Sequence, residues 1–141
     1  MRNFILFTPL AAMFVLVISS AGKTEDQKAD KPEKPTSNQL LMRDKLVQMN
    51  RVLEGITLDK FDQVAESGEL LRMISKATSW HIVEPTPQYK RMSMNFQEQA
   101  ADLERHAKER NIEAATLDLV RMNVTCTQCH QHMREVAARR K

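Results

Sequence analysis

Glycine and cysteine are both scarce in this chain of 141 residues, which has three glycines and two cysteines. With cysteine only at Cys126 and Cys129, a framework of several disulfides is excluded, and stability must come from packing. No segment alternates between apolar and polar residues with the period of two that marks a β-strand. The few glycines and the absence of this alternation disfavour a β-rich fold.

A large excess of charge of one sign is also missing. The formal net charge is +3 at pH 7, the sequence pI is about 9.0, and 28% of the residues are charged. A net charge this small is not typical of a nucleic-acid-binding protein, so we expect no nucleic-acid partner. The length suits one domain and is short for two.

The first 21 residues have the pattern of an export signal. Arg2 gives a short basic start, an apolar run of about fifteen residues follows, and Ser19, Ser20 and Ala21 form a small-residue cleavage pattern. The run is shorter than the roughly twenty residues that span a bilayer, so we expect cleavage near Gly22. The alternative, an uncleaved segment, would tether the protein to a membrane. No cysteine lies near the cleavage pattern to carry a lipid anchor.

Residues 22–37 form a charged leader with almost no apolar side chains, too polar to order itself. From residue 38 to 141 we expect one helical domain. Apolar residues recur there with the 3.6-residue period in four stretches separated by Gly, Pro or Asn signals. These stretches are about 38–55, 59–80, 87–109 and 112–138. The pattern predicts an all-α fold, an up-down-up-down four-helix bundle.

The segment from Cys126 to His130 reads Cys-Thr-Gln-Cys-His, the C-x-x-C-H pattern of covalent haem attachment. Two thiols three positions apart can each bond one haem vinyl group, and the next imidazole can bind the iron. Two alternatives are a redox dithiol and half of a zinc site. A redox dithiol is expected where a helix opens after a strand, and structural zinc needs four ligands, which His132 does not complete.

The position of this motif in the last helix resembles class II c-type cytochromes, the cytochrome c-prime family. Cys126, Cys129, His130 and Arg134 match the family's Cys-x-x-Cys-His-x-x-Tyr-Arg, while Met133 stands in place of the tyrosine. The resemblance covers about residues 38–136. It implies a single covalent heme c in a four-helix bundle, a periplasmic location and a possible homodimer.

Two features depart from the family pattern. The usual helix 1 arginine is replaced by Asn38, and the only tryptophan, Trp80, lies at the end of the second helix, where we expect it to pack. The chain therefore resembles a divergent branch.

The sixth iron ligand decides what such a haem does. In an up-down bundle the start of the first helix lies at the same end as the end of the fourth, so Met42 can face His130. Met49 is the alternative, and an open sixth position is another. Arg134, one turn after His130, can reach a haem propionate or remain a solvated charge, and Arg43 and Lys45 are weaker candidates.

These residues predict a non-enzymatic electron carrier that passes single electrons between protein redox partners by iron cycling. The alternative is a five-coordinate haem that binds nitric oxide or carbon monoxide. A third class is a helical protein without haem.

Overall fold

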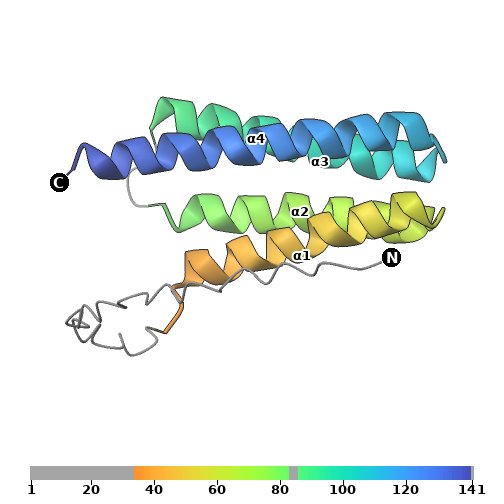
Figure 1. The fold of residues 1–141 in the computed structure, drawn as a ribbon, viewed down its shortest axis with the longest axis horizontal. Helices are drawn as coiled ribbons and strands as arrows, with labels where there is room; N and C mark the ends of the chain where they lie inside the picture. The colour runs from red at the N-terminus through yellow and green to blue at the C-terminus, as the bar shows by residue number, and fades with distance from the viewer. Residues whose placement is uncertain (1–33, 83–85, 141) are drawn as a thin grey trace, which may run out of the picture. The chain divides into compact units, whose positions relative to one another are not determined.

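The protein is described by a computed structural model over residues 34–82 and 86–140, and these residues form four helices (Figure 1). The prediction of an all-α protein with four helices is confirmed, and no strand occurs among the described residues. Residues 1–21 and most of the charged leader lie outside the described ranges. Within those ranges, no helix combines the length and apolarity needed to cross a membrane. The helices are α1 Ser37–Thr57, α2 Phe61–Trp80, α3 Pro87–Lys108 and α4 Ile112–Ala138.

The start of α1 is capped by Thr36, two residues before the predicted start of this helix at about residue 38. The Thr36 hydroxyl accepts from the backbone N–H of Gln39 at 3.2 Å, and Gln39 Oε1 accepts from the Thr36 N–H at 2.7 Å. This reciprocal capping box needs a Glu or Gln three residues after the cap, which Thr36 has. The predicted stop at Gly55 is wrong, because Gly55 is buried in the helix and α1 continues to Thr57.

The starts of α3 and α4 agree with the sequence prediction, whereas the start of α2 does not. Lys60 is the N-cap of α2 and makes no side-chain cap bond, and α2 begins at Phe61, two residues after the predicted start at about residue 59. Asp59 instead takes a positive φ of 59° in the tight turn. Thr86 caps α3 immediately before Pro87, and Asn111 caps α4 by accepting from the Ala114 N–H at 3.0 Å. The last two starts agree with the predicted bounds.

The helices pack side by side in a bundle whose four contacts are unequal. α1 packs on α2, α2 on α3 and α3 on α4 along extensive faces, whereas the contact of α1 with α4 is much the smallest. One apolar cluster fills the interior with side chains from all four helices. Its largest fully buried members are Leu71, Leu103, Met122, Val52 and Val64.

Two side-chain bonds tie helix ends together near the C-terminus of α4. The Asn38 amide, at the start of α1, donates to the His81 carbonyl after the end of α2 at 3.4 Å. Thr86, at the start of α3, is hydrogen-bonded to His132 Nε2, late in α4, at 2.7 Å. At the other end, His106 of α3 contacts Asp118 of α4. These contacts place the late residues of α4 at the bundle end where α2 stops and α3 starts.

Three apolar side chains that the periodic pattern assigned to packing are exposed. Leu46 and Leu53 of α1 are 63% and 55% exposed, and Trp80 is 87% exposed. Arg51 marks the α2 side of α1, because its carbonyl accepts from Gln63 and its guanidinium pairs with Glu66. At 100° per residue the two leucines lie about 140° to 160° around the helix from Arg51, on the side away from α2.

α2 approaches α3 closely at Gly68, where a Cβ would lie 3.1 Å from the Ala100 carbonyl oxygen and 3.2 Å from Glu104 Cβ. We expect Gly68→Val to lower the free energy of unfolding by about 2 kcal/mol, because two helix backbones would have to separate. Glu69→Val, which introduces the same side chain at an exposed neighbour and lowers helix propensity slightly, should cost less than about 1 kcal/mol. Chemical denaturation of the two variants measures the difference, and equal stabilities would contradict the close packing.

Candidate functional site

The three motif side chains lie on one stretch of α4. Cys126 and Cys129 are half-buried free thiols, and His130 follows as an exposed residue. Residues three apart on a helix share a face, so both sulfur atoms turn toward the interior while the imidazole stands at its edge. The helix that carries them runs unbroken from Ile112 to Ala138.

All three motif residues line one cavity, to which the four helices contribute. We call it the motif cavity. Met42 lines it from α1, so the structure brings this sequence-predicted residue together with Cys126, Cys129 and His130. The remaining lining residues are Lys45, Ser75, Tyr89, Met92, Ser93, Phe96 and Thr125. Thioether and aromatic side chains make up much of the wall, as is typical of a site for an apolar cofactor.

The motif cavity lies where the bundle is least closed. It takes side chains from both α1 and α4, the pair of helices with the smallest contact. Leu46 comes four residues after Met42 and Leu53 four residues after Met49, so both exposed leucines continue the face of α1 that carries these methionines. A surface apolar strip beside a cavity is a feature that a bound apolar group would cover.

Met42 and Met49 differ in their surroundings. Met49 is 7% exposed and belongs to the apolar core with Val52 and Leu71, and it does not line the motif cavity. Met92 of α3 does line it, and the sequence analysis did not single out this residue. A signal was present, because Met92 precedes Phe96 by four residues on one face, but that spacing is equally typical of core packing.

Two residues of α1 line the motif cavity, and Lys45 is the charged one. Its Nζ lies 4.9 Å from the centroid of the Phe96 ring, a cation–π contact. Burial lowers the pKa of Lys45, and the nearby thiols Cys126 and Cys129 raise it in part. Among the described residues no carboxylate forms an ion pair with this lysine.

Burial raises the pKa of both thiols, and the Lys45 ammonium opposes this effect. At neutral pH both sulfur atoms are therefore held mainly as thiols, with the ammonium as the nearby group that favours the thiolate. Burial likewise raises the pKa of Tyr89, while hydrogen bonding to Ser79 and Ser93 lowers it in part. The phenol therefore stays neutral beside the cysteines.

The other three histidines are placed away from the motif cavity. His132 is buried and bonded to Thr86, His106 Nδ1 lies 2.5 Å from Asp118 Oδ2, and His81 is exposed after α2. Within the described residues no group of three or more His, Cys, Asp or Glu side chains could hold a metal ion. His130 is therefore the imidazole that shares a cavity with both cysteines.

Arg134 and Arg43 are exposed, and neither lines the motif cavity. Their predicted role as propionate partners needs a group that extends out of the cavity toward solvent. Arg134 lies one turn after His130, so its side chain can reach such a group along the surface of α4.

The side chains around the motif are of the types that bind a haem, but the cavity is too small to hold one. Two thiols, an imidazole and a thioether share one cavity with aromatic walls. Its volume of about 50 Å³ is well below the several hundred Å³ of sites for large ligands. A porphyrin would therefore need α1 to move away from α4, which is the pair with the least packing to lose.

The thiols give a test of the local electrostatics. In polypeptide made without a cofactor, alkylation of Cys126 and Cys129 by iodoacetamide at pH 7 should be roughly tenfold slower than for an unfolded peptide, because burial raises both pKa values. Lys45→Met should slow it further, since the ammonium that lowers both pKa values is removed. Lys76→Met, which alters a lysine outside the cavity wall, is the control. Equal rates in the two variants would contradict the effect of Lys45.

Comparisons with protein-family models, with curated proteins and with solved structures find no match for this chain. The assignment of a function therefore depends on the motif from Cys126 to His130 and on the cavity that these residues line.

Proposed function

We propose that this protein is a monohaem c-type cytochrome that carries single electrons between protein partners. The observation that supports it is the meeting of Cys126, Cys129, His130 and Met42 in one cavity. A C-x-x-C-H segment alone is a sequence pattern. Its coincidence with a thioether from another helix, in an apolar cavity, is what covalent haem with two axial ligands requires.

Each residue then has a defined role. Cys126 and Cys129 add to the two vinyl groups, so that sulfur bonds one vinyl carbon and hydrogen goes to the other, and no oxidant is needed. His130 and Met42, which line the same cavity, would supply the two protein ligands to the iron. The bound haem supplies an Fe(III)/Fe(II) couple, and the protein sets its potential through the axial ligands and the burial of the ring.

Lys45 acts during attachment rather than in electron transfer. Its ammonium lies near both sulfur atoms and favours the thiolate, which is the better nucleophile. Since the haem propionates extend from the edge opposite the thioether-bearing edge, a lysine beside the thiols is poorly placed to pair with them. Arg134, outside the cavity, remains the propionate partner in this proposal.

The proposal includes an up-down-up-down order of the helices. The bonds from Asn38 to His81 and from Thr86 to His132 support it, because they join the start of one helix to the end of another near the end of α4. In that order the first turns of α1 lie across from the last turns of α4. Met42 and His130 are then on opposite sides of the same cofactor.

The proposal also places the protein in the periplasm, with residues 1–21 as its signal. This part is supported by the sequence pattern of the first 21 residues and by the known attachment of c-type haem outside the cytoplasm.

A five-coordinate, gas-binding haem is the second candidate. Met42 is only half-buried, and it shares the cavity with a second thioether, Met92, so neither methionine is held in one position by a close-packed core. If neither binds, the iron is open to nitric oxide or carbon monoxide.

The central prediction concerns covalent attachment. Protein produced with haem-attachment machinery should have a mass equal to the mature polypeptide plus one haem. Cys126→Ala and Cys129→Ala should each lose one thioether, and the double variant should retain no covalent haem, because the chain has no other thiol. Mass spectrometry under denaturing conditions measures this. A wild-type mass equal to the bare polypeptide would remove the proposal.

The axial ligand is tested by optical spectra of three variants. Met42→Ala should lose the ferric methionine-to-iron charge-transfer band, bind carbon monoxide and show a lower potential, because a thioether is removed from the iron. Met49→Ala should keep the band and lose about 2 to 4 kcal/mol of stability, since Met49 is a core residue. Loss of the band in Met92→Ala instead would assign the ligand to α3. A wild-type protein already high-spin and open to carbon monoxide would favour the gas-binding candidate.

A further inference from the structure

Charge is distributed unevenly between the two ends of the bundle. The half that contains the motif comprises residues 34–47, 71–82, 86–97 and 126–140, and we call it the motif half. It carries ten Lys or Arg and two Asp or Glu, a formal charge of +8. The rest of the described residues carry six and eleven, a formal charge of −5. The modest overall charge of the protein therefore conceals a strongly basic end.

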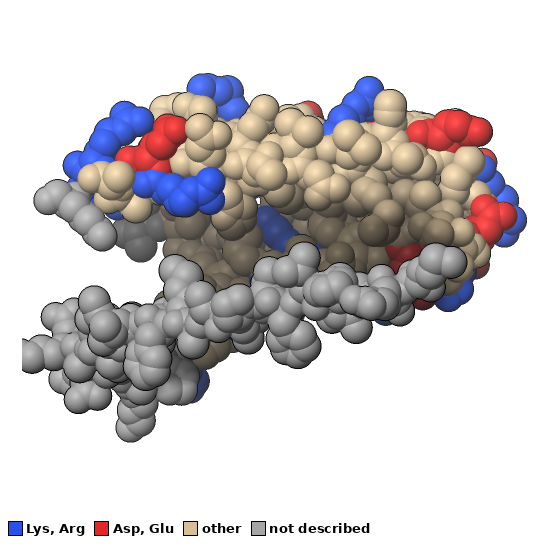
Figure 2. Space-filling model, viewed as in Figure 1, with Lys and Arg blue, Asp and Glu red and all other residues tan. Residues whose placement is uncertain are grey.

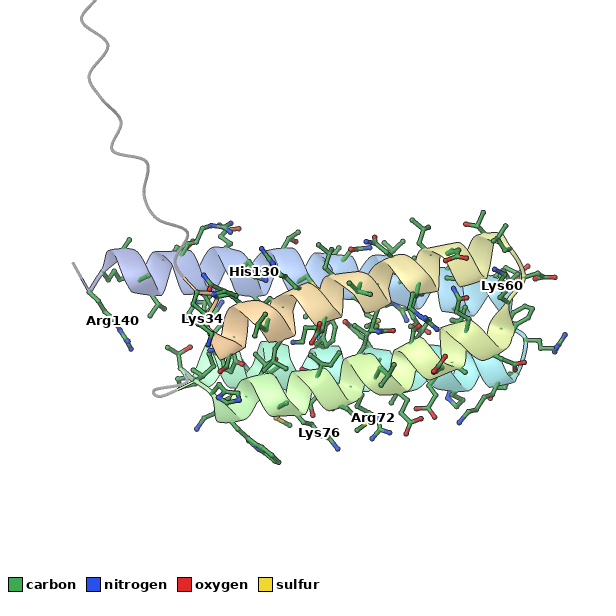
Figure 3. All side chains as sticks on the ribbon, turned by 90° about the horizontal axis from the view of Figure 1, so that it is seen from below. Lys34, Lys60, Arg72, Lys76, His130 and Arg140 are labelled. Atoms are coloured by element: carbon green, nitrogen blue, oxygen red, sulfur yellow. The ribbon has the colours of Figure 1, made fainter. Side chains whose placement is uncertain are left out.

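The structure confirms that this division along the chain is a division in space. Lys34, Lys76 and Arg140 lie toward the same end of the bundle, and Lys60 lies at the other (Figure 3). Figure 2 shows Lys and Arg at both ends of the face it presents, whereas most of the Asp and Glu on that face lie at the end opposite the C-terminus. A separation of charge on this scale orients a protein in the field of a charged partner.

The ion pairs follow the same division. Those in the far half pair basic residues with nearby carboxylates, as in Lys60 with Glu54 at 3.1 Å and Lys108 with Glu104 at 2.6 Å. Within the motif half, the ion pair between described residues is Arg139 with Glu135, and Arg72 pairs across the division with Glu104 of the far half at 3.8 Å. No described carboxylate pairs with four of its basic residues, which are Lys76, Lys90, Arg91 and Arg134. These cations are available to an outside anion.

Trp80 adds an apolar anchor to this basic surface. It ends α2, is 87% exposed, and follows Lys76 by one turn. The 2.8 Å bond between the hydroxyls of Ser79 and Ser93 brings the end of α2 against the first turns of α3, which carry Lys90. An exposed tryptophan among unpaired cations is the composition of a protein contact site, where aromatic residues and arginine contribute most of the binding energy.

We propose that the surface formed by Trp80, Lys76 and Lys90 docks an acidic face of a partner protein. This inference rests on the proposed function, since the partner is then the protein that exchanges electrons with the haem. Cys126 and His130 lie in the same half of the bundle, so a partner held there is near the redox centre. An acidic protein is favoured over an anionic membrane, because the unpaired cations Lys76 and Lys90 accompany a single large aromatic residue rather than an extended apolar face.

The test measures binding of poly-L-glutamate to the full holoprotein by calorimetry at about 10 mM salt, where the Debye length is about 30 Å. Lys76→Glu/Lys90→Glu should weaken binding about tenfold. The matched control Lys60→Glu/Lys108→Glu makes the same change in net charge at the far end, and should weaken binding less than about twofold. At about 0.5 M salt the difference should vanish. Equal weakening by the two pairs would overturn the docking surface.

Trp80 is tested with a copolymer of glutamate and tyrosine. Trp80→Ala should weaken binding of this copolymer severalfold and leave poly-L-glutamate unchanged, because only the copolymer offers an aromatic partner. An unchanged affinity for both would remove Trp80 from the surface. Binding of vesicles that contain phosphatidylglycerol, without binding of either polypeptide, would overturn the choice of a protein partner.

Electron exchange separates this inference from the proposed function. Lys76→Glu/Lys90→Glu should slow electron transfer from the ferrous protein to hexacyanoferrate(III) severalfold and accelerate transfer to hexaammineruthenium(III), with little change in the far-end control. Failure of haem attachment would abolish this redox signal while the calorimetry still reports on the surface. Unchanged rates in a haem-loaded protein would show that the basic surface does not serve the redox centre.

Discussion

The small contact between α1 and α4 is the constraint on which the functional part of this structure depends. α1 is held mainly by α2, through Gly55, which packs closely on Val64, and through the bonds of Arg51 to Gln63 and Glu66. Its opposite side has little to pack against, and Leu46 and Leu53 stay exposed there. The motif cavity, with both cysteines, takes side chains from these two loosely joined helices as well as from α2 and α3. A bundle closed equally on all sides would bury the leucines and exclude a large cofactor.

The rest of the bundle is packed in a way that can tolerate movement of α1. The pairs α2 with α3 and α3 with α4 share extensive faces, and the approach at Gly68 brings two helix backbones close together. His106 and Asp118 join α3 to α4 at one end, and Thr86 and His132 join them at the other. A cofactor attached to α4 would therefore be carried by a rigid three-helix unit, and α1 would adjust to it.

Electrostatics and packing converge at the same end of the molecule. Lys45 is a half-buried cation with no described carboxylate partner, an arrangement that costs stability. Its neighbours are the two thiols, and the proposed role in the covalent step would account for its retention there. The unpaired cations on the outer surface of that end act at longer range, on partners rather than on the cofactor. One end of the bundle thus combines the reacting groups with the surface that would attract a partner.

The sequence by itself determined the four helices and most of their bounds, because periodicity and caps are local. Asn111 before α4 and Thr86 before Pro87 act through bonds to residues three positions away, which any reader of the chain can count. The motif from Cys126 to His130 is local in the same sense. The sequence also drew attention to Met42, through the expected order of helices.

Only the tertiary structure decided which apolar faces find a partner. The apolar residues of α1 recur with the 3.6-residue period of a buried helix face. Periodicity alone could not predict that α1 makes so little contact with α4 that Leu46 and Leu53 stay exposed. Trp80 was expected to pack, yet α2 ends where no neighbour covers it. Lys45 and Met92 joined the cavity for the same reason, since the residues across a cavity come from helices far apart in the chain. A periodic pattern specifies a face, whereas burial depends on what the fold places opposite that face.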